Sequence, residues 1–294
     1  MAGLVGSRST EPGLGPVVSI VTPSYNQAVF LESTIESVLG QTYPHVEYFV
    51  CDGGSQDGSV EIIKRYGSRL AWWCSEQDRG QSDAINKGWR RATGDIIAYL
   101  NSDDVLLPGA VERIVRAFQQ TPTVAVVYGD WVYLDEQGSE LGLGRGAPTD
   151  FRRLLRDGQG AYIGQPASFY SASAMRTVGL IDERLHYSMD YDLLLRLARA
   201  GEMRYLPVPL AGYRVHAGAK TSTSTEYHWK ESLAVRERYG GGYWSKQRVL
   251  YWRYRALAAL PQRFQMWFRG TRNSVKDWAV LAADAAKRGR KSVR

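Results

Sequence analysis

Long hydrophobic runs are missing from this chain of 294 residues, and cysteine is scarce. No stretch approaches the roughly eighteen uninterrupted apolar residues of a membrane-spanning helix, which argues against an integral membrane protein. Cys51 and Cys74 are the only cysteines, too few for a thiolate metal site, and we expect both to be reduced thiols inside strands. There is no internal repeat and no low-complexity tract. A composition with 44% apolar residues indicates a globular protein, either one large domain with an appendage or two small domains.

The two ends of the chain differ in composition from the rest. Residues 1–16 are rich in Gly, Ser and Pro and lack the basic start and apolar run of a signal peptide, so we expect a disordered leader. Residues 243–294 contain thirteen Lys or Arg and two Asp, a net charge of +11, whereas the preceding 242 residues carry −4. The basic character of the chain therefore belongs to its C-terminal tail.

Apolar segments alternate with helical patterns from residue 17 to residue 128. The expected strands are 17–21, 46–51, 70–74, 95–100 and 124–128, and the expected helices are 30–39, 59–66, 82–92 and 111–118. This alternation predicts an α/β fold with a mostly parallel, doubly wound sheet and helices on both faces.

Beyond Asp130 the alternation breaks. We expect a hairpin over 131–141, a short helix over 148–156, a strand within 162–170, a helix from 189, strands over 203–206 and 210–215, and a helix over 229–239. This half of the protein is predicted to be less regular than the first.

Polar residues follow several of the predicted strands. The segment Ile96–Val105, IIAYLNSDDV, ends a buried strand in two adjacent carboxylates, Asp103 and Asp104, and the first and second strands end near Tyr25 and Asp52. Open α/β sheets bind ligands at this edge. Adjacent carboxylates repel unless a positive charge compensates them, and a divalent cation is the simplest candidate. The alternative is a solvated turn that starts the next helix.

Six motifs occur in a fixed order between roughly Val17 and Thr221. They are TPSYN (22–26), DGGSQDGS (52–59), EQDRGQSDAINKG (76–88), GDIIAYLNSDD (94–104), MDYD (189–192) and YRVH (213–216). In this order they resemble the inverting glycosyltransferases of family 2, which have the GT-A fold. The resemblance implies a GT-A domain over 17–225, with a nucleotide-binding half at 17–130 and an acceptor-binding half at 131–225. A basic, aromatic-rich helical tail would follow at 226–294.

The resemblance implies transfer of a sugar from a nucleotide donor, expected to be UDP-linked, with Mg²⁺ or Mn²⁺ at the diphosphate. Asp104 would be the direct metal ligand, and Asp103 would contact the ribose or metal-bound waters. Asp52 would read the nucleobase; the alternative is that it stabilises an Asx-type turn before two glycines. The remaining implied nucleotide contacts are Pro23, Tyr25 and Asp83.

Asp190 is the implied general base that removes the proton from the acceptor hydroxyl. Family members commonly carry Glu-Asp where this chain has Met189-Asp190, so one carboxylate is missing. The alternative is that Asp190 and Asp192 only favour a helix N-terminus. His216 resembles a histidine that reaches the metal or diphosphate in some relatives; the alternative is a polar surface residue.

Acceptor recognition is expected from the irregular half. Trp131 and Tyr162 would offer flat faces to a sugar ring, and Gln165 would bind its hydroxyls. Core packing explains the same aromatic residues equally well, and the sequence leaves both interpretations open. Arg79 would either contact phosphate or be solvated, whereas residues 86–88 fit a helix end that packs on the sheet.

The tail interleaves aromatic residues with its cations. This pattern predicts either a helix on an anionic membrane surface, through 243–294, or an appendage that packs on the domain; no nucleic acid partner is expected. We expect a cytoplasmic enzyme, peripheral on the inner face of the membrane if the tail binds lipid. It would glycosylate a sugar or lipid-linked acceptor in bacterial surface polysaccharide or glycolipid assembly. The alternatives are a protein or small-molecule acceptor, or a non-catalytic sugar-nucleotide-binding scaffold.

Overall fold

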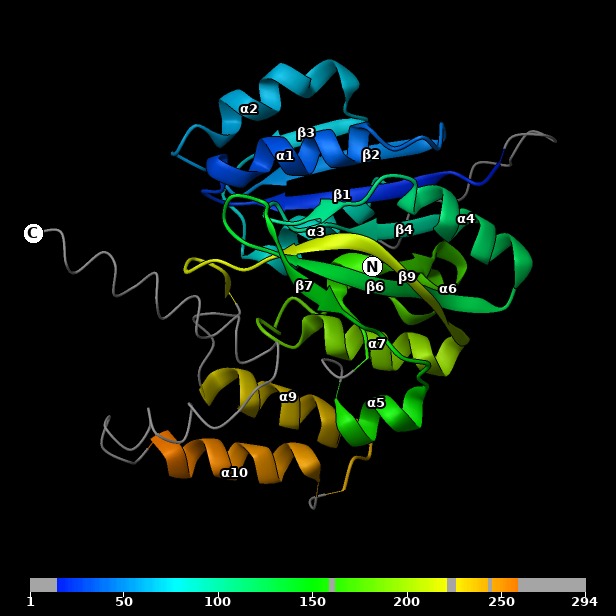
Figure 1. Cartoon of the computed structure of the whole chain (residues 1–294), viewed down its shortest axis with the longest axis vertical. Helices are drawn as coiled ribbons and strands as arrows, with labels where there is room; N and C mark the ends of the chain where they lie inside the picture. Colours follow the sequence, from blue (N-terminus) through cyan, green and yellow to red (C-terminus); the bar gives the residue numbers. More distant parts are fainter. Residues whose placement is uncertain (1–14, 159–161, 221–225, 243–244, 259–294) are drawn as a thin grey trace, which may run out of the picture.

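A nine-stranded sheet forms the centre of the computed structural model, which describes residues 15–158, 162–220, 226–242 and 245–258 (Figure 1). The strands are β1 (Val18–Ser24), β2 (Val46–Asp52), β3 (Trp72–Ser75), β4 (Ile96–Tyr99), β5 (Val105–Leu106), β6 (Val124–Leu134), β7 (Glu140–Gly144), β8 (Ser168–Ser171) and β9 (Glu202–Arg214). The α-helices are α1 (Ala28–Leu39), α2 (Ser59–Tyr66), α3 (Gln81–Trp89), α4 (Ala110–Gln120), α5 (Phe151–Asp157), α6 (Ala172–Val178), α7 (Met189–Ala200), α9 (Glu226–Arg238) and α10 (Lys246–Ala258).

The strand order is β3-β2-β1-β4-β8-β6-β9-β5, and β7 pairs with β6. The first four strands in this order are parallel, and their register brings Ser24, Asp52 and Ser75 side by side at one edge. From β8 onward the sheet is mixed, because β8 is antiparallel to both β4 and β6. The parallel part therefore delivers three strand ends to one edge.

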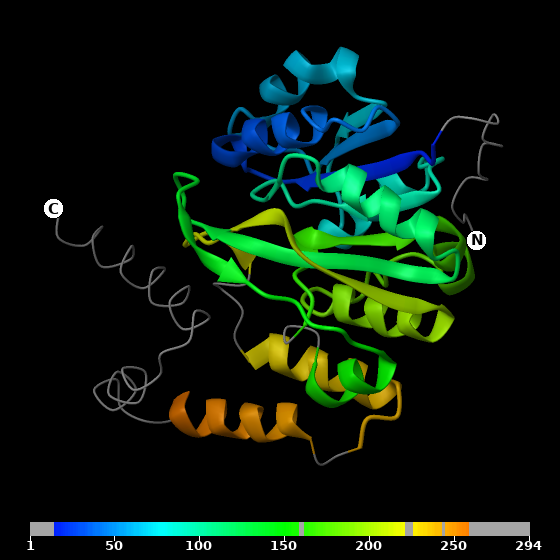
Figure 2. The ribbon, with the colours of Figure 1, turned by 45° about the vertical axis from the view of Figure 1, so that its right-hand side comes forward.

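Hydrophobic residues cover both faces of the sheet. Along β1, Ile20 packs with residues of α1, α2 and α4, whereas its neighbour Val21 packs with residues of α3, α6 and α7. Neighbouring strand residues point to opposite faces, so a run of apolar residues fits a strand that is covered on both sides. The predicted α/β fold with helices on both faces is confirmed (Figure 2).

One strand replaces two in the second half. We expected separate strands over 203–206 and 210–215, but β9 runs unbroken from Glu202 to Arg214 beside β6. The register advances from Gly129 opposite Leu206 to Asp130 opposite Pro209, so a bulge accommodates the proline-containing segment between them. The sequence also did not predict the short strand β5 or the helix α6.

Helices α9 and α10 lie beside α5 at the end of the molecule opposite α2, in both views (Figures 1 and 2). The Arg236 guanidinium of α9 donates to the Leu155 carbonyl of α5, 2.7 Å away, and Tyr251 of α10 is 9% exposed. This part of the predicted tail therefore packs on the domain. Within the described ranges, no helix is both long and apolar enough to cross a membrane. The predicted leader up to residue 14 and the tail from 259 lie outside the described residues.

Helix α3 packs directly on β1 through Gly88. A Cβ atom added at Gly88 would lie 2.6 Å from both methyl carbons of Val21, which confirms the packing interpretation of residues 86–88. We expect Gly88→Ala to lower the free energy of unfolding by about 1–3 kcal/mol, because the added methyl overpacks this contact. The midpoint of thermal unfolding measures the effect. Gly242→Ala is the matched control, since nothing lies within 4 Å of its added Cβ; equal midpoints for the two variants would contradict the prediction.

Candidate functional site

A cavity of about 590 Å³ opens at the edge where β1, β2 and β4 end. Its lining comes from residues that follow these strands, from the segment before and within the first turn of α3, from the end of β9 and the residues after it, and from His186. The sheet topology thus brings together segments that are up to roughly two hundred residues apart in the chain, at the edge where open α/β sheets bind ligands.

Asp103 and Asp104 both line this cavity. Asp104 is 1% exposed; its Oδ1 accepts a hydrogen bond from the Arg214 backbone N–H at 2.9 Å, and its Oδ2 lies 3.5 Å from Asn101 Nδ2. Burial, together with the neighbouring Asp103 carboxylate, raises the pKa of Asp104 well above its usual value. The charged form of this carboxylate is therefore poorly compensated by the protein.

These carboxylates fit a divalent cation that takes most of its ligands from elsewhere. The described part of the chain has no group of three or more His, Cys, Asp or Glu side chains arranged to hold a metal ion. Mg²⁺ characteristically binds through one or two carboxylates and completes its shell with phosphate oxygens and waters. Asp103 and Asp104 match that donor set, and a cation would relieve their repulsion.

His216 is buried beside the carboxylate pair. Its Nε2 lies 2.9 Å from Asp103 Oδ2, and its ring packs on Phe30 with the ring centroids 4.6 Å apart. At 6% exposure, His216 is not the polar surface residue of the alternative interpretation. It contacts Asp103 but does not itself line the cavity.

Pro23, Ser24 and Tyr25 line the cavity where β1 ends. Tyr25 is 62% exposed, so one face of its ring is accessible to a ligand. Ser24 is buried, and its Oγ has no hydrogen-bond partner among the residues that the structure describes. A buried hydroxyl without a partner at a cavity wall indicates a place for a polar ligand atom.

Asp52 lies behind the cavity wall. Its carboxylate is 2% exposed and accepts hydrogen bonds from the backbone N–H groups of Gly54 and Ser55 at 3.1 and 2.9 Å, and from Ser75 Oγ at 2.7 Å. These are the contacts of the Asx-type turn, and Gly53 rather than Asp52 lines the cavity.

Asp83 and Arg79 are engaged with protein partners. The Arg79 guanidinium lies 3.2 Å from Asp83 and 2.6 Å from Glu183. Asp83 also lies 3.9 Å from the Lys87 ammonium. Neither Asp83 nor Arg79 lines the cavity, and the Arg79 side chain is 73% exposed, which agrees with the interpretation that it is solvated.

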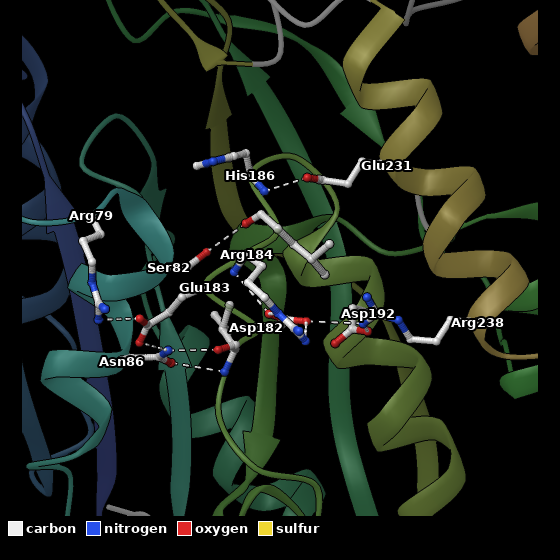
Figure 3. Close-up of polar contacts among 12 residues, drawn as sticks. Arg79, Ser82, Asn86, Asp182, Glu183, Arg184, His186, Asp192, Glu231 and Arg238 are labelled. Carbon is white, nitrogen blue, oxygen red and sulfur yellow. Dashed lines mark hydrogen bonds and ion pairs between the residues drawn. The ribbon is translucent and has the colours of Figure 1, made fainter. Parts of the chain in front are cut away.

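The two carboxylates of the MDYD motif have different surroundings. Asp192 is 1% exposed and bonds to Arg196 and Tyr239, each at 2.9 Å. It also bonds to Arg238 at 3.1 Å (Figure 3), so it is a structural residue. Asp190 is half-buried at the start of α7. It lies outside the cavity lining but interacts electrostatically with Lys220, which lines the cavity.

Met189 is a core residue. It is 4% exposed, packs in the cluster of α3, α6 and α7, and its sulfur accepts a hydrogen bond from Ser82 Oγ at 2.7 Å. A glutamate in this position would be buried in apolar surroundings, which is costly for a charged group. The surroundings of residue 189 in this protein therefore suit the methionine that it carries.

None of the three expected acceptor contacts lines the cavity. Trp131 is 6% exposed and packs closely on Gly144 and Gly164, so core packing is the interpretation that fits it. The Tyr162 hydroxyl donates to Asp157. Gln165 donates to the Tyr99 carbonyl at 2.9 Å and accepts from Asn101 at 3.0 Å, so it supports the strand end that carries Asp104.

Lys220, Gln81 and Asn101 line the cavity but were not predicted as site residues. Lys220 Nζ donates to Gln81 Oε1 at 2.9 Å, and Gln81 Nε2 donates to Asn101 Oδ1 at 2.6 Å. Burial lowers the pKa of Lys220, while Asp190 and Glu231 oppose this shift. Gln81 and Asn101 fall within two of the recognised motifs, whereas no pattern in the sequence distinguishes Lys220.

Comparison with known proteins agrees with this architecture. Chondroitin synthase of Pasteurella multocida (strain Pm70) is 31% identical over 193 residues, which cover 65% of this chain and 20% of the synthase. The chain therefore spans about a fifth of the length of that relative.

Two solved structures share the fold. S. aureus TarS 1–349 in complex with UDP-GlcNAc superposes with a TM-score of 0.59 and 16% identity, covering 74% of this chain and 65% of that one. The mannosyltransferase PcManGT from Pyrobaculum calidifontis, in complex with GDP-Man and Mn²⁺, has a TM-score of 0.59 and 18% identity, covering 97% of this chain and 77% of that one. Residues 19–178, more than half of the sequence, match the family model, and the chain belongs to glycosyl transferase family 2.

Proposed function

We propose that this protein is a metal-dependent inverting glycosyltransferase that moves a sugar from a nucleotide donor, UDP-linked, to an acceptor hydroxyl. The observation that carries the proposal is the pair Asp103–Asp104 at the strand edge, in a cavity that is also lined by Lys220, a residue that interacts electrostatically with Asp190. Related folds bind UDP-GlcNAc, or GDP-Man with Mn²⁺, which supports a nucleotide-sugar donor and a divalent cation.

The donor half of the site would bind the nucleotide and its leaving diphosphate. Pro23 and Tyr25 flank the base, and the Ser24 hydroxyl bonds a polar atom of the nucleotide. Asp104 and Asp103 would hold Mg²⁺ or Mn²⁺, and His216 would fix the orientation of Asp103. When bound, the cation supplies positive charge at the diphosphate. Asp52 and Asp83 do not line the cavity, and they would act indirectly, by hydrogen bonds that hold the loops after β2 and before α3 in place.

The acceptor half would activate the hydroxyl. Asp190 takes the proton of the acceptor O–H as the oxygen bonds to the anomeric carbon and the bond from that carbon to the diphosphate oxygen breaks. A single displacement of this kind inverts the anomeric configuration. Lys220 interacts electrostatically with Asp190 and lines the cavity, so it joins the general base to the donor site.

The role of a non-catalytic scaffold has no observation in its favour. Its support in the sequence was Met189 in place of a glutamate, and this side chain lies in the core rather than at the cavity. For the acceptor, the homology to a chondroitin synthase favours a carbohydrate, and we place the protein in bacterial surface polysaccharide or glycolipid assembly.

Metal-dependent nucleotide binding tests the donor half. With Mn²⁺ present, UDP at about a hundred times its dissociation constant should stabilise the protein by about 2.7 kcal/mol and raise the unfolding midpoint by several degrees. Asp104→Asn should reduce this shift to less than about 1 °C, because one carboxylate ligand is lost. Glu112→Gln on the exposed face of α4 is the control and should keep the full shift. Stabilisation without metal would remove Asp104 from the ligand role.

Substitutions in the MDYD motif should separate catalysis from stability. We expect Asp190→Asn to lower the rate of nucleoside diphosphate release by about 10²-fold or more, with nucleotide affinity unchanged, because the general base is lost. Asp192→Asn should instead lower the free energy of unfolding by about 3 kcal/mol, since Arg196 and Arg238 lose a buried partner. Kinetics and thermal unfolding of both variants measure the difference. A wild type that binds nucleotide but neither hydrolyses nor transfers any donor would contradict the enzyme assignment.

The tail gives a separate proposal, contact with an anionic membrane surface. Residues 246–258 contain no Asp or Glu, and Val249, Trp252 and Arg253 are exposed on α10. Basic residues beside exposed aromatic residues favour binding to anionic lipid. The other interpretation of the tail, packing on the domain, is compatible with this proposal, because α10 packs through its opposite side, where Tyr251 is buried.

Sedimentation with vesicles of phosphatidylserine and phosphatidylcholine tests this contact. We expect binding at low salt that weakens at high salt, because exposed charges are screened. Trp252→Ser should weaken it at least threefold, whereas Val29→Ser, an exposed position on α1, should not. Absence of binding at either salt concentration would leave only packing as the role of α10.

A further inference from the structure

The loop that leads into Asp190 lies between helices α3 and α9 (Figure 3). On the α3 side, Asn86 bonds to both the carbonyl and the N–H of Ile181, at 2.9 and 3.1 Å, and the Ser82 hydroxyl donates to the Leu185 carbonyl at 3.2 Å. These contacts fix the beginning of the loop on the sheet side of the molecule.

On the α9 side, one carboxylate binds the end of the loop. Glu231 accepts hydrogen bonds from the backbone N–H groups of His186 at 2.8 Å, Tyr187 at 2.6 Å and Ser188 at 2.6 Å. Hydrogen bonds to a charged acceptor are short and about twice as strong as neutral ones. These three residues directly precede Met189 and Asp190, the first residues of α7.

The N-cap residue of α7 provides no side-chain cap, and within the first turn the Asp190 carboxylate accepts a hydrogen bond from the N–H of Tyr191 at 2.8 Å. Ser188 is the N-cap residue, but its side chain makes no capping bond, and its buried Oγ has no partner within the described ranges. A carboxylate at a helix N-terminus satisfies backbone donors and interacts favourably with the helix dipole. Glu231 supplies a carboxylate from another helix, and the donors that it binds belong to the three residues just before α7.

Glu231 and Asp190 also share two titratable neighbours, Lys220 and His228. Burial lowers the pKa values of both Lys220 and His228, and in each case Asp190 and Glu231 oppose the shift. The four side chains therefore interact electrostatically, which agrees with the backbone contacts in placing Glu231 next to the acceptor half of the site.

We propose that Glu231 is a positioning residue for Asp190: by binding the N–H groups of residues 186–188, it sets the direction in which α7 presents the general base. This inference rests on the proposed function. It also assigns α9, which the sequence grouped with the tail, to the catalytic unit.

Glu231→Gln tests the inference with little change in shape. The amide keeps one acceptor oxygen but turns an NH₂ group toward backbone donors, so at least one of the three bonds is lost. The assay follows nucleoside diphosphate release from the best of UDP-glucose, UDP-N-acetylglucosamine and GDP-mannose. Water serves as the acceptor, because its O–H needs the same base. We expect kcat to fall at least tenfold, while the KM for the donor and the Kd for UDP with Mn²⁺ stay within twofold.

The control is Glu226→Gln on the same helix, whose carboxylate contacts Lys230 and Tyr251 instead of the loop; its kcat should equal that of the wild type. If Glu231→Gln does not fold, Glu231→Asp replaces it in the test. This variant keeps the charge but shortens the side chain by one methylene, so kcat should fall while the Kd for UDP stays unchanged.

Two results would overturn the inference: a kcat within twofold of wild type for the folded variant, or a loss of UDP affinity as large as the loss of kcat, which indicates a general structural role. A wild type that binds UDP with metal but releases no product from any donor contradicts the proposed function instead, so the two failures are distinguishable.

Discussion

The repulsion between two adjacent carboxylates at the end of β4 is the constraint on which the rest of the site depends. Asp104 is almost completely buried, and the shortest hydrogen bond of its carboxylate comes from the backbone N–H of Arg214 at the end of β9. Burying a charge that is only partly compensated is unfavourable. The fold tolerates this cost where a divalent cation would relieve it, and a cation there would in turn attract a diphosphate, which is the physical basis for placing the donor there.

The same contact joins the two halves of the chain. Arg214 donates from its backbone to the Asp104 carboxylate and from its side chain to the Asp103 carbonyl, each at 2.9 Å. The end of β9 is therefore hydrogen-bonded to the residues that follow β4. Strand β9 reaches this point because it pairs with β6 along its whole length, with a bulge near Pro209. His216 follows two residues later and contacts Asp103. The irregular second half of the chain is thus attached to the parallel first half at the carboxylate pair itself.

Much of the parallel half could be predicted from the sequence, because its signals are local. Apolar runs followed by polar turns identified β1, β2 and β4, and the parallel register then brings their ends to one edge. The irregular half was harder to predict. Two expected strands proved to be the single strand β9. The prolines between them suggested that the strand ends there, but pairing with β6, with a bulge at this point, keeps the strand continuous. Nothing in the sequence around Trp131 distinguishes an aromatic ring that stacks on a sugar from one that packs in the core. Its close packing on Gly144 and Gly164 in the structure shows that it is a core residue.

By itself, the sequence determined the family, the α/β architecture and the identity of the carboxylates at the strand ends, because motif order, hydrophobic period and residue chemistry are properties of the chain read in one dimension. Only the tertiary structure decided which of those residues face the cavity. It placed Asp52 and Asp83 behind the wall, paired Asp192 with arginines, and brought Lys220 to Gln81 and Glu231 to the loop before Asp190. These arrangements join residues far apart in the chain through packing of separate elements, and no local pattern encodes such contacts.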